Sequence, residues 1–212
     1  RRQRQMCIRD SNTGVQIKYK NEKDKHLQLA AAFTAKVGEI MTACQLGKVS
    51  NDVFVLNAYH YVAQNTVYDN ASTDTYSAIM TGKGMSAAIS GMFEYLVQQA
   101  GVDASHMVGK DAAGSPWFFS RAKLGGQIYD FDIASELSVR KGEGLTCFAM
   151  TDKELTATGV QKGFTYTDGK KAGKIELEEN KFSPLRSCAY YELKGNVIHA
   201  ALYSGETKDI TL

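Results

Sequence analysis

The sequence predicts an α+β fold, in which N-terminal helices pack on an antiparallel β-sheet and extra strands follow towards the C-terminus. Two observations lead to this prediction. Apolar residues recur at helical spacing through most of the first hundred residues, whereas the remainder holds short segments separated by glycine-containing turns. Helices that come first and strands that come later do not form the βαβ units of a parallel sheet. At 212 residues and 43% hydrophobic composition, the chain is long enough to bury one sizeable core.

Three amphipathic helices are expected in the first half of the chain. They span residues 24–46, about 51–65 and 85–100, and each has apolar residues three or four positions apart. Gly47 and Gly101 follow the first and third helices, where a glycine suits the left-handed residue after a helix. Before the helices, residues 15–19 alternate between apolar and polar and predict a short, half-exposed strand.

Short strands are expected after the third helix. The pair Gly125–Gly126 has the composition of a tight hairpin turn, and a second turn is expected at residues 194–196. The strands that flank or neighbour these turns cover residues 104–108, 116–123, 127–132, 174–177, 189–193 and 197–203. The sequence thus predicts one sheet directly after the helices and further strands near the C-terminus.

The chain is expected to divide into three parts. Residues 1–11 include four arginines, show neither a helical nor a strand period, and resemble translated adapter sequence of the kind found in metagenomic assemblies. We therefore interpret them as a non-native leader, so that the natural start and any export signal are not defined by this chain. The core is expected at residues 12–156. Residues 157–212 form either a β-rich extension or a truncated module.

Composition argues against several classes of function. The formal net charge is only +2, and much of it lies in the leader, so no nucleic-acid partner is expected. No run of about 18 apolar residues predicts a transmembrane helix. The segment Gly82–Gly84 lacks the flanking residues of a phosphate-binding loop. No metal or other cofactor is predicted, because the four cysteines are far apart and are expected to be free, buried thiols: Cys7, Cys44, Cys147 and Cys188.

Five local strings, in order, resemble the core of transglutaminase-like domains, which share the fold of papain-like cysteine proteases. The segment ending Gly-Lys-Gly-Met-Ser at position 86 is similar to the Gly-x-Gly-Val-Cys that precedes the family's nucleophile. Ser-Pro-Trp-Phe resembles its His-Ala-Trp-Asn, and Gly-Gln-Ile-Tyr-Asp-Phe-Asp resembles its Gly-x-Trp-Tyr-x-x-Asp. The resemblance covers about residues 27–155, and its strings are Asn57–Asp69, Thr75–Ser86, Ser115–Phe118, Gly126–Asp132 and Cys147–Glu154.

The resemblance implies a degenerate catalytic triad. In the family, a cysteine at a helix N-terminus, a histidine on a neighbouring strand and a carboxylate on the next strand share the chemistry. Carried over by position, these residues are Ser86, Ser115 and Asp132, so only the carboxylate remains. The resemblance also places Trp117, Tyr129, Gly84 and Met85 along the old substrate cleft.

Each candidate also has a structural interpretation. Serine before an apolar helical run is an ordinary N-cap, which would account for Ser86. Asp132 could equally be a turn or cap aspartate, and Trp117 a core residue whose indole N–H is hydrogen-bonded. His106 lies before the Trp-bearing strand and could face the site from an adjacent strand if the hairpin register is shifted. Otherwise it is a partly exposed polar side chain.

The sequence therefore predicts a non-catalytic, transglutaminase-like domain with a binding or structural role. By analogy with bacterial relatives, its partner would be a peptide, a protein or a cell-wall ligand, and the resemblance implies an extracellular or cell-surface setting. The alternative is an active hydrolase or transferase on peptide amides that uses Ser86 with another base such as His106.

Overall fold

The computed structural model describes residues 23–140, 144–166, 169–175, 177 and 179–212. The three predicted helices are confirmed: α1 spans Lys23–Ala43, α2 Asn51–Asn65 and α4 Ser86–Gln99. A further short helix, α3 (Thr75–Thr81), lies between them and is capped by the preceding aspartate. The leader and the strand expected at residues 15–19 lie outside the described residues.

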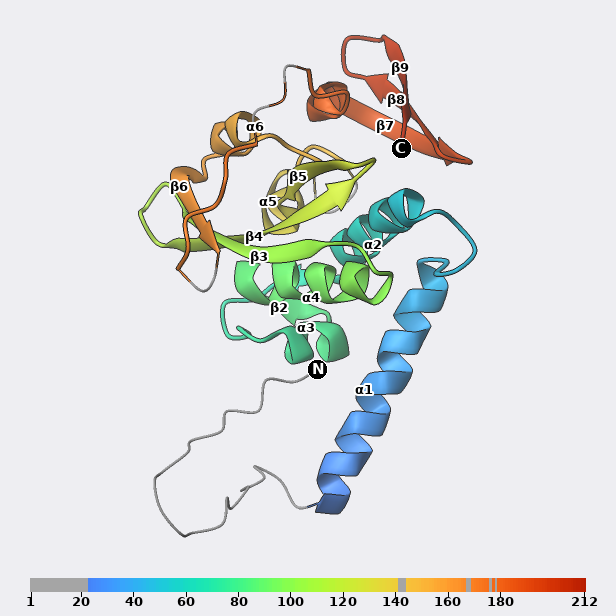
Figure 1. Ribbon diagram of the computed structural model, residues 1–212, viewed down its shortest axis with the longest axis vertical. Coiled ribbons are helices and arrows are strands. Elements are labelled where there is room, and N and C mark those ends of the chain that lie inside the picture. Colours follow the sequence, from blue (N-terminus) through green and yellow to red (C-terminus); the bar gives the residue numbers. More distant parts are fainter. Residues whose placement is uncertain (1–22, 141–143, 167–168, 176, 178) are drawn as a thin grey trace.

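A four-stranded antiparallel sheet follows the helices, in the order β5-β4-β3-β6. Its strands are β3 (Ala104–Lys110), β4 (Pro116–Leu124), β5 (Gln127–Phe131) and β6 (Gln161–Tyr166). The predicted turn at Gly125 and Gly126 is confirmed, since both residues have positive φ values, of 57° and 83°. Helices packed on this antiparallel sheet confirm the predicted α+β class (Figure 1).

The main core lies where α2 and α4 meet the sheet. Tyr59, on α2, is fully buried at its centre and makes edge-to-face contacts with Phe93 and Phe148. Its hydroxyl donates to the buried Glu136, at 2.9 Å, and Glu136 lies on α5 (Ile133–Arg140). Helix α5 was not predicted from the sequence, because its short apolar pattern is interrupted by Glu136, a charged residue that this structure buries.

A second, three-stranded antiparallel sheet lies near the C-terminus. It consists of β7 (Cys188–Lys194), β8 (Val197–Leu202) and β9 (Thr207–Thr211), in that order, and Gly195 makes the predicted turn. The strand expected at residues 174–177 is wrong for the described residues 174, 175 and 177. Side chains hold that stretch instead: the Ile175 N–H donates to Asp152, at 3.2 Å.

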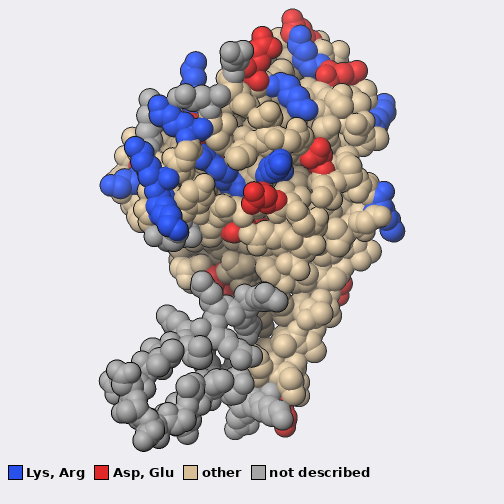
Figure 2. All heavy atoms as spheres, viewed as in Figure 1, with Lys and Arg blue, Asp and Glu red and all other residues tan. Residues whose placement is uncertain are grey.

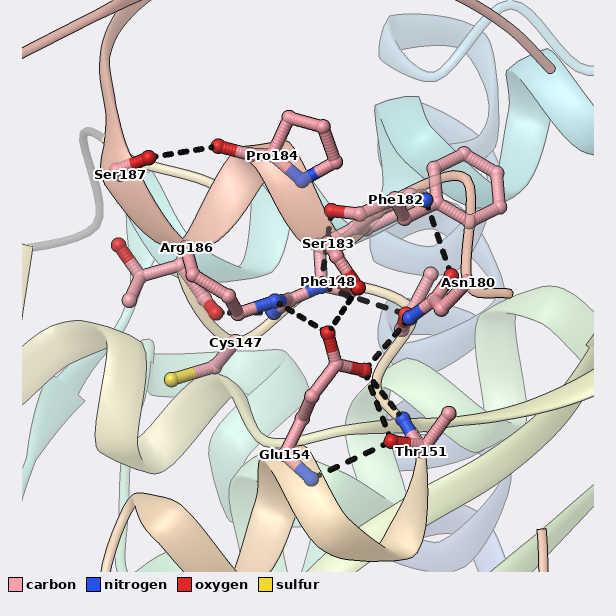
Figure 3. Close-up of polar contacts among 12 residues, drawn as sticks. Cys147, Phe148, Thr151, Glu154, Asn180, Phe182, Ser183, Pro184, Arg186 and Ser187 are labelled. Carbon is pink, nitrogen blue, oxygen red and sulfur yellow. Dashed lines mark hydrogen bonds and ion pairs between the residues drawn. The ribbon is translucent and has the colours of Figure 1, made fainter. Parts of the chain in front are cut away.

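Polar side chains join the C-terminal segment to the core (Figure 3). Glu154 lies on α6 (Asp152–Ala157) and accepts hydrogen bonds from Asn180 at 2.6 Å and Ser183 at 2.7 Å. Arg186 follows on the 3-10 helix η1 (Ser183–Ser187), pairs with Glu154 at 3.5 Å, and donates to three main-chain carbonyls of residues 146–149. Residues far apart in sequence are therefore cross-linked by charge-assisted bonds.

The surface is uneven in shape and charge. The first half of α1 extends away from the body of the molecule (Figure 1), and Leu27 on it is 56% exposed. On the face shown in Figure 2, basic side chains gather over β6 and the nearby β3–β4 turn, where Lys110 and Lys171 are exposed. Among the described residues, no helix is long and apolar enough to span a membrane.

Candidate functional site

Ser86 is the first residue of α4, and its side chain is 1% exposed. The prediction that it caps this helix is wrong by one residue, because Met85 is the N-cap and no side chain caps the helix. The Ser86 hydroxyl instead accepts a hydrogen bond from the Phe118 N–H on β4, at 3.3 Å. The hydroxyl thus joins the start of α4 to the neighbouring strand.

Two glycines fix the backbone that leads to Ser86. Strand β2 (Lys83–Gly84) pairs in parallel with β1 (Val67–Tyr68). Gly82 has φ +66°, and a Cβ there would lie 2.5 Å from the Asn65 carbonyl oxygen. At Gly84 a Cβ would lie 2.6 Å from that of Ala88, so only glycine lets this strand approach α4 so closely.

Asp132 follows β5 and is fully buried. Its Oδ1 accepts from the Ser135 N–H at 3.0 Å, as a cap of α5 would. Its Oδ2 accepts from the Ser135 hydroxyl at 2.7 Å and from the Trp117 indole Nε1 at 2.9 Å. Burial raises the pKa of this carboxyl, and these hydrogen bonds act in the opposite direction. Its bonds to Ser135 agree with the interpretation of Asp132 as a helix cap, and its bond to Trp117 agrees with the interpretation as a site residue.

Trp117, rather than Ser115, is the β4 residue that faces Asp132. Ser115 lies in the exposed β3–β4 turn, where its N–H donates to the Asp111 carboxylate at 2.8 Å and its carbonyl accepts from the Asp111 N–H, also at 2.8 Å. The structure therefore joins Ser86 and Asp132 to two adjacent residues of β4, Phe118 and Trp117. It does not bring Ser115 to them.

His106 contacts α4 one turn beyond Ser86. It pairs with Ser120 across β3 and β4, and its Nε2 lies 2.8 Å from the Ser90 hydroxyl oxygen. Its Nδ1 lies 3.6 Å from the Glu94 carboxylate. Burial lowers the pKa of His106 and raises that of Glu94 to about 7, because a partly enclosed site disfavours both charged forms.

The predicted cleft-lining residues separate into two groups. Met85 is half-buried and Gly84 is buried, and both lie at the start of α4 beside Ser86. The prediction that Tyr129 lines a cleft does not agree with its position: the side chain is 3% exposed, and its ring packs edge-to-face on Phe182 within the core. Alternation along β5 places Tyr129 on the face of the sheet that packs against Phe182, and the equally buried Asp130 on the opposite face, where it pairs with Arg121.

Tyr68 is a site residue that the sequence did not predict. Its ring is stacked on that of Trp117, with centroids 6.1 Å apart and planes inclined by 10°. Tyr68 is 36% exposed and the neighbouring Val67 65% exposed, so an aromatic surface borders the Ser86 region. The sequence did contain a signal, the Tyr-Asp pair after α2. This pair is part of the Asn57–Asp69 string that resembles the family, but no role was assigned to Tyr68 from it.

Within the described residues, no group of three or more His, Cys, Asp or Glu side chains could hold a metal ion. Cys44, Cys147 and Cys188 are buried and form no disulfide bond within the described residues, as predicted for these three, and Cys7 lies outside the described residues. Burial raises the pKa of the Cys44 thiol to about 12. Burial also raises the pKa of the Cys147 thiol, so Cys44 and Cys147 are poor nucleophiles.

Comparison with solved structures finds proteins of the class that the sequence resembles. One is a transglutaminase (18% identity; 54% of this chain and 33% of that one; TM-score 0.39). Another is a candidate cysteine protease from Cytophaga hutchinsonii (11% identity; 76% of this chain and 59% of that one; TM-score 0.42). A third is a candidate protease from Parabacteroides distasonis (11% identity; 70% of this chain and 30% of that one; TM-score 0.42). The chain thus spans less than two thirds of each. No protein-family model and no curated protein matches it.

Proposed function

We propose that this chain is a non-catalytic, transglutaminase-like domain that binds a peptide, protein or cell-wall partner. The observation that supports this most directly is the 2.9 Å hydrogen bond from the Trp117 indole to Asp132. In a thiol triad, the group held by that carboxylate is the imidazole that moves the proton. An indole N–H only donates and is not a base near neutral pH.

The environment of Ser86 supports the same proposal. Its oxygen already accepts the Phe118 N–H, and its side chain is almost fully enclosed. A serine hydroxyl needs an adjacent base to become a nucleophile. The nearest histidine on the neighbouring strands, His106, is hydrogen-bonded to Ser90 instead.

A binding role is supported by the aromatic surface beside this position. Tyr68 and Trp117 present stacked rings, of which Tyr68 is partly exposed, and such rings supply contact area with little loss of conformational entropy. Because Trp117 is the only tryptophan, its fluorescence reports directly on this surface.

The test is turnover and binding measured on the same preparation. The chain is incubated with peptide-amide, amine and glutamine substrates beside a Ser86→Ala variant, while Trp117 fluorescence follows binding. We expect the Ser86→Ala variant to show the same background turnover as the unchanged chain. We also expect ligands to change the Trp117 fluorescence, and Tyr68→Ala to weaken that binding. Turnover lost in the Ser86→Ala variant would overturn the proposal.

The second candidate is a hydrolase that acts on peptide amides with Ser86 and His106. The favouring observation is that His106, on β3, lies beside a polar row on α4, with its Nε2 2.8 Å from the Ser90 hydroxyl and its Nδ1 3.6 Å from the Glu94 carboxylate. A hydrolase of this kind predicts activity that is lost in both Ser86→Ala and His106→Gln. Activity that survives either change would exclude this pair of residues.

A further inference from the structure

The outer edge of β7 carries main-chain groups that face away from β8. The Leu212 N–H donates to the Asn196 carbonyl, so the main-chain groups of residue 196 point towards β9. Because main-chain groups alternate along a strand, those of residues 197, 199 and 201 on β8 point towards β7. Their register partners on β7 are residues 194, 192 and 190. The N–H and C=O groups of Tyr191 and Leu193 therefore point to the outer edge, where no strand of the described chain pairs with β7.

A groove lies beside this edge, with a volume of about 510 Å³. One wall is β7 and the other is a single face of α2, so the groove runs between the C-terminal sheet and the helical core. Its lining residues are Leu56, Asn57, His60, Gln64, Ala189, Tyr190, Tyr191 and Leu193. The volume falls in the range of sites that bind small ligands or short peptide segments.

The residues that line the groove indicate which kind of ligand it can bind. None of the lining residues is an aspartate, glutamate, lysine or arginine. Burial lowers the pKa of His60, whose Nδ1 lies 2.5 Å from the Tyr191 hydroxyl, so the imidazole is neutral near pH 7. A charged side chain entering the groove would lose water without gaining an opposite charge. Apolar and neutral polar groups are favoured.

The two walls offer different partners to an extended chain. Tyr191 and Leu193 present alternate donors and acceptors spaced as a strand requires. On the facing helix, Asn57, His60 and Gln64 bring amide and imidazole groups to the same groove. A strand laid along β7 would have its inner edge paired with β7 and its outer edge near these polar side chains, so both edges could be satisfied.

We propose that the β7–α2 groove binds an extended, uncharged peptide segment, which adds as a strand to the outer edge of β7. Main-chain hydrogen bonds to Tyr191 and Leu193 would supply affinity, and alternate side chains of the peptide would enter the groove. This site is separate from the Tyr68–Trp117 surface of the proposed function and does not depend on it.

The opposite edge of the same sheet is a natural control. There, β9 presents the exposed, charged side chains of Lys208 and Asp209, which discourage strand addition. In β9, residues 208 and 210 direct their main-chain groups towards β8, whereas residues 207, 209 and 211 direct theirs to the outer edge. A proline at position 207 therefore removes an outward N–H without touching β7.

The experiment selects hexapeptides from a displayed library that omits Asp, Glu, Lys, Arg and Pro, and measures their binding to the full chain. Proline at an outward position of an edge strand deletes one donor and leaves the inner ladder intact. We expect Leu193→Pro to weaken binding at least tenfold and Thr207→Pro to change it less than twofold. Circular dichroism shows whether each variant is folded.

A second measurement uses only the unchanged protein. N-methylation of each peptide residue in turn should weaken binding at every second residue, because only alternate N–H groups face β7. Trp117 fluorescence should not respond to these peptides, which separates this site from the aromatic surface. Three results would overturn the proposal: no enriched peptide, binding without a period of two, or a concentration-dependent dimer abolished by Leu193→Pro, which would assign the edge to a second copy.

Discussion

Introducing a cysteine at position 86 and a histidine on or beside β4 tests which residue of that segment lies against Asp132 and the start of α4. The double variant Ser86→Cys with Trp117→His places an imidazole where the indole now donates to Asp132 at 2.9 Å. The matched control is Ser86→Cys with Ser115→His, which puts the same residue in the turn that bonds Asp111. Both variants carry Cys7→Ser, so that the remaining native thiols are the three buried ones.

The size of the effect follows from three contributions to the pKa of the new thiol. Burial of position 86 raises it above the usual value of about 8.5. The α4 N-terminus lowers it by the equivalent of about 0.3–2 kcal/mol. A protonated imidazole about 4 Å away contributes roughly 4 kcal/mol near a protein surface, or about three pKa units. The first two contributions are the same in Ser86→Cys alone, so we expect the thiol pKa of the Trp117→His pair to lie about three units below that of Ser86→Cys alone.

The assay is the rate of iodoacetamide labelling between pH 5 and 10, together with thiolate absorbance. The control pair should titrate like Ser86→Cys alone, because Ser115 is held at Asp111. Loss of the Trp117 ring costs roughly 3 kcal/mol of stability, so each variant is first checked for cooperative unfolding. A lower thiol pKa in the Ser115→His pair, or equal values in both pairs, would refute the assignment of Trp117.

Three further predictions concern stability, each measured by urea unfolding followed by circular dichroism. Trp117→Phe should cost about 1–3 kcal/mol, because buried Asp132 loses a donor, whereas Tyr68→Phe should cost under 1 kcal/mol. Arg186→Met should lower the free energy of unfolding by about 3–5 kcal/mol, because Glu154 and several main-chain carbonyls lose their partner. We expect the variant to unfold in one transition. Two transitions would mean that residues 157–212 unfold separately from the core. The pKa of Glu94 is raised from 4.5 to about 7, so its stabilising contribution is complete below pH 4.5 and is lost, by about 3 kcal/mol, as the pH rises through 7. The Glu94→Gln variant should lack this loss.

Local signals were sufficient for much of the fold. The hairpin between β4 and β5 was predictable because Gly125 and Gly126 both need positive φ, and the end of α4 because Gly101 does. The cap of α2 was also predictable, since Ser50 precedes the apolar run and accepts from the Val53 N–H at 3.3 Å. Each of these depends on residues within a few positions of one another.

The site depended on a register that the sequence does not specify. Positions 115 and 117 have the same parity in β4, so strand alternation cannot distinguish which of them faces Asp132. The β3–β4 turn decides it, because the Asp111 carboxylate accepts from the N–H groups of residues 113 and 115 and holds Ser115 outside the strand. A short, local polar contact thus keeps Ser115 in the turn, while Trp117, two residues later, donates to Asp132.

Long-range burial explains the other differences. Glu136 reads as a surface residue in the sequence, yet it is fully buried and accepts from the Tyr59 hydroxyl and from the Cys147 N–H. These donors come from an α2 residue 77 positions earlier and a loop 11 positions later. No periodicity within α5 could have revealed them, so the helix itself was not predicted.

The contacts of Asp132 bear on how a retained carboxylate should be interpreted. In this structure it accepts two hydrogen bonds from Ser135 at the start of α5 and one from Trp117. A buried carboxylate with these donors stabilises the backbone whether or not catalysis occurs, and removing it would leave the donors unsatisfied. The aspartate is therefore accounted for by structure alone. One of these donors is the indole of Trp117, which is not a base near neutral pH, and this contact is the one on which the proposed non-catalytic function rests.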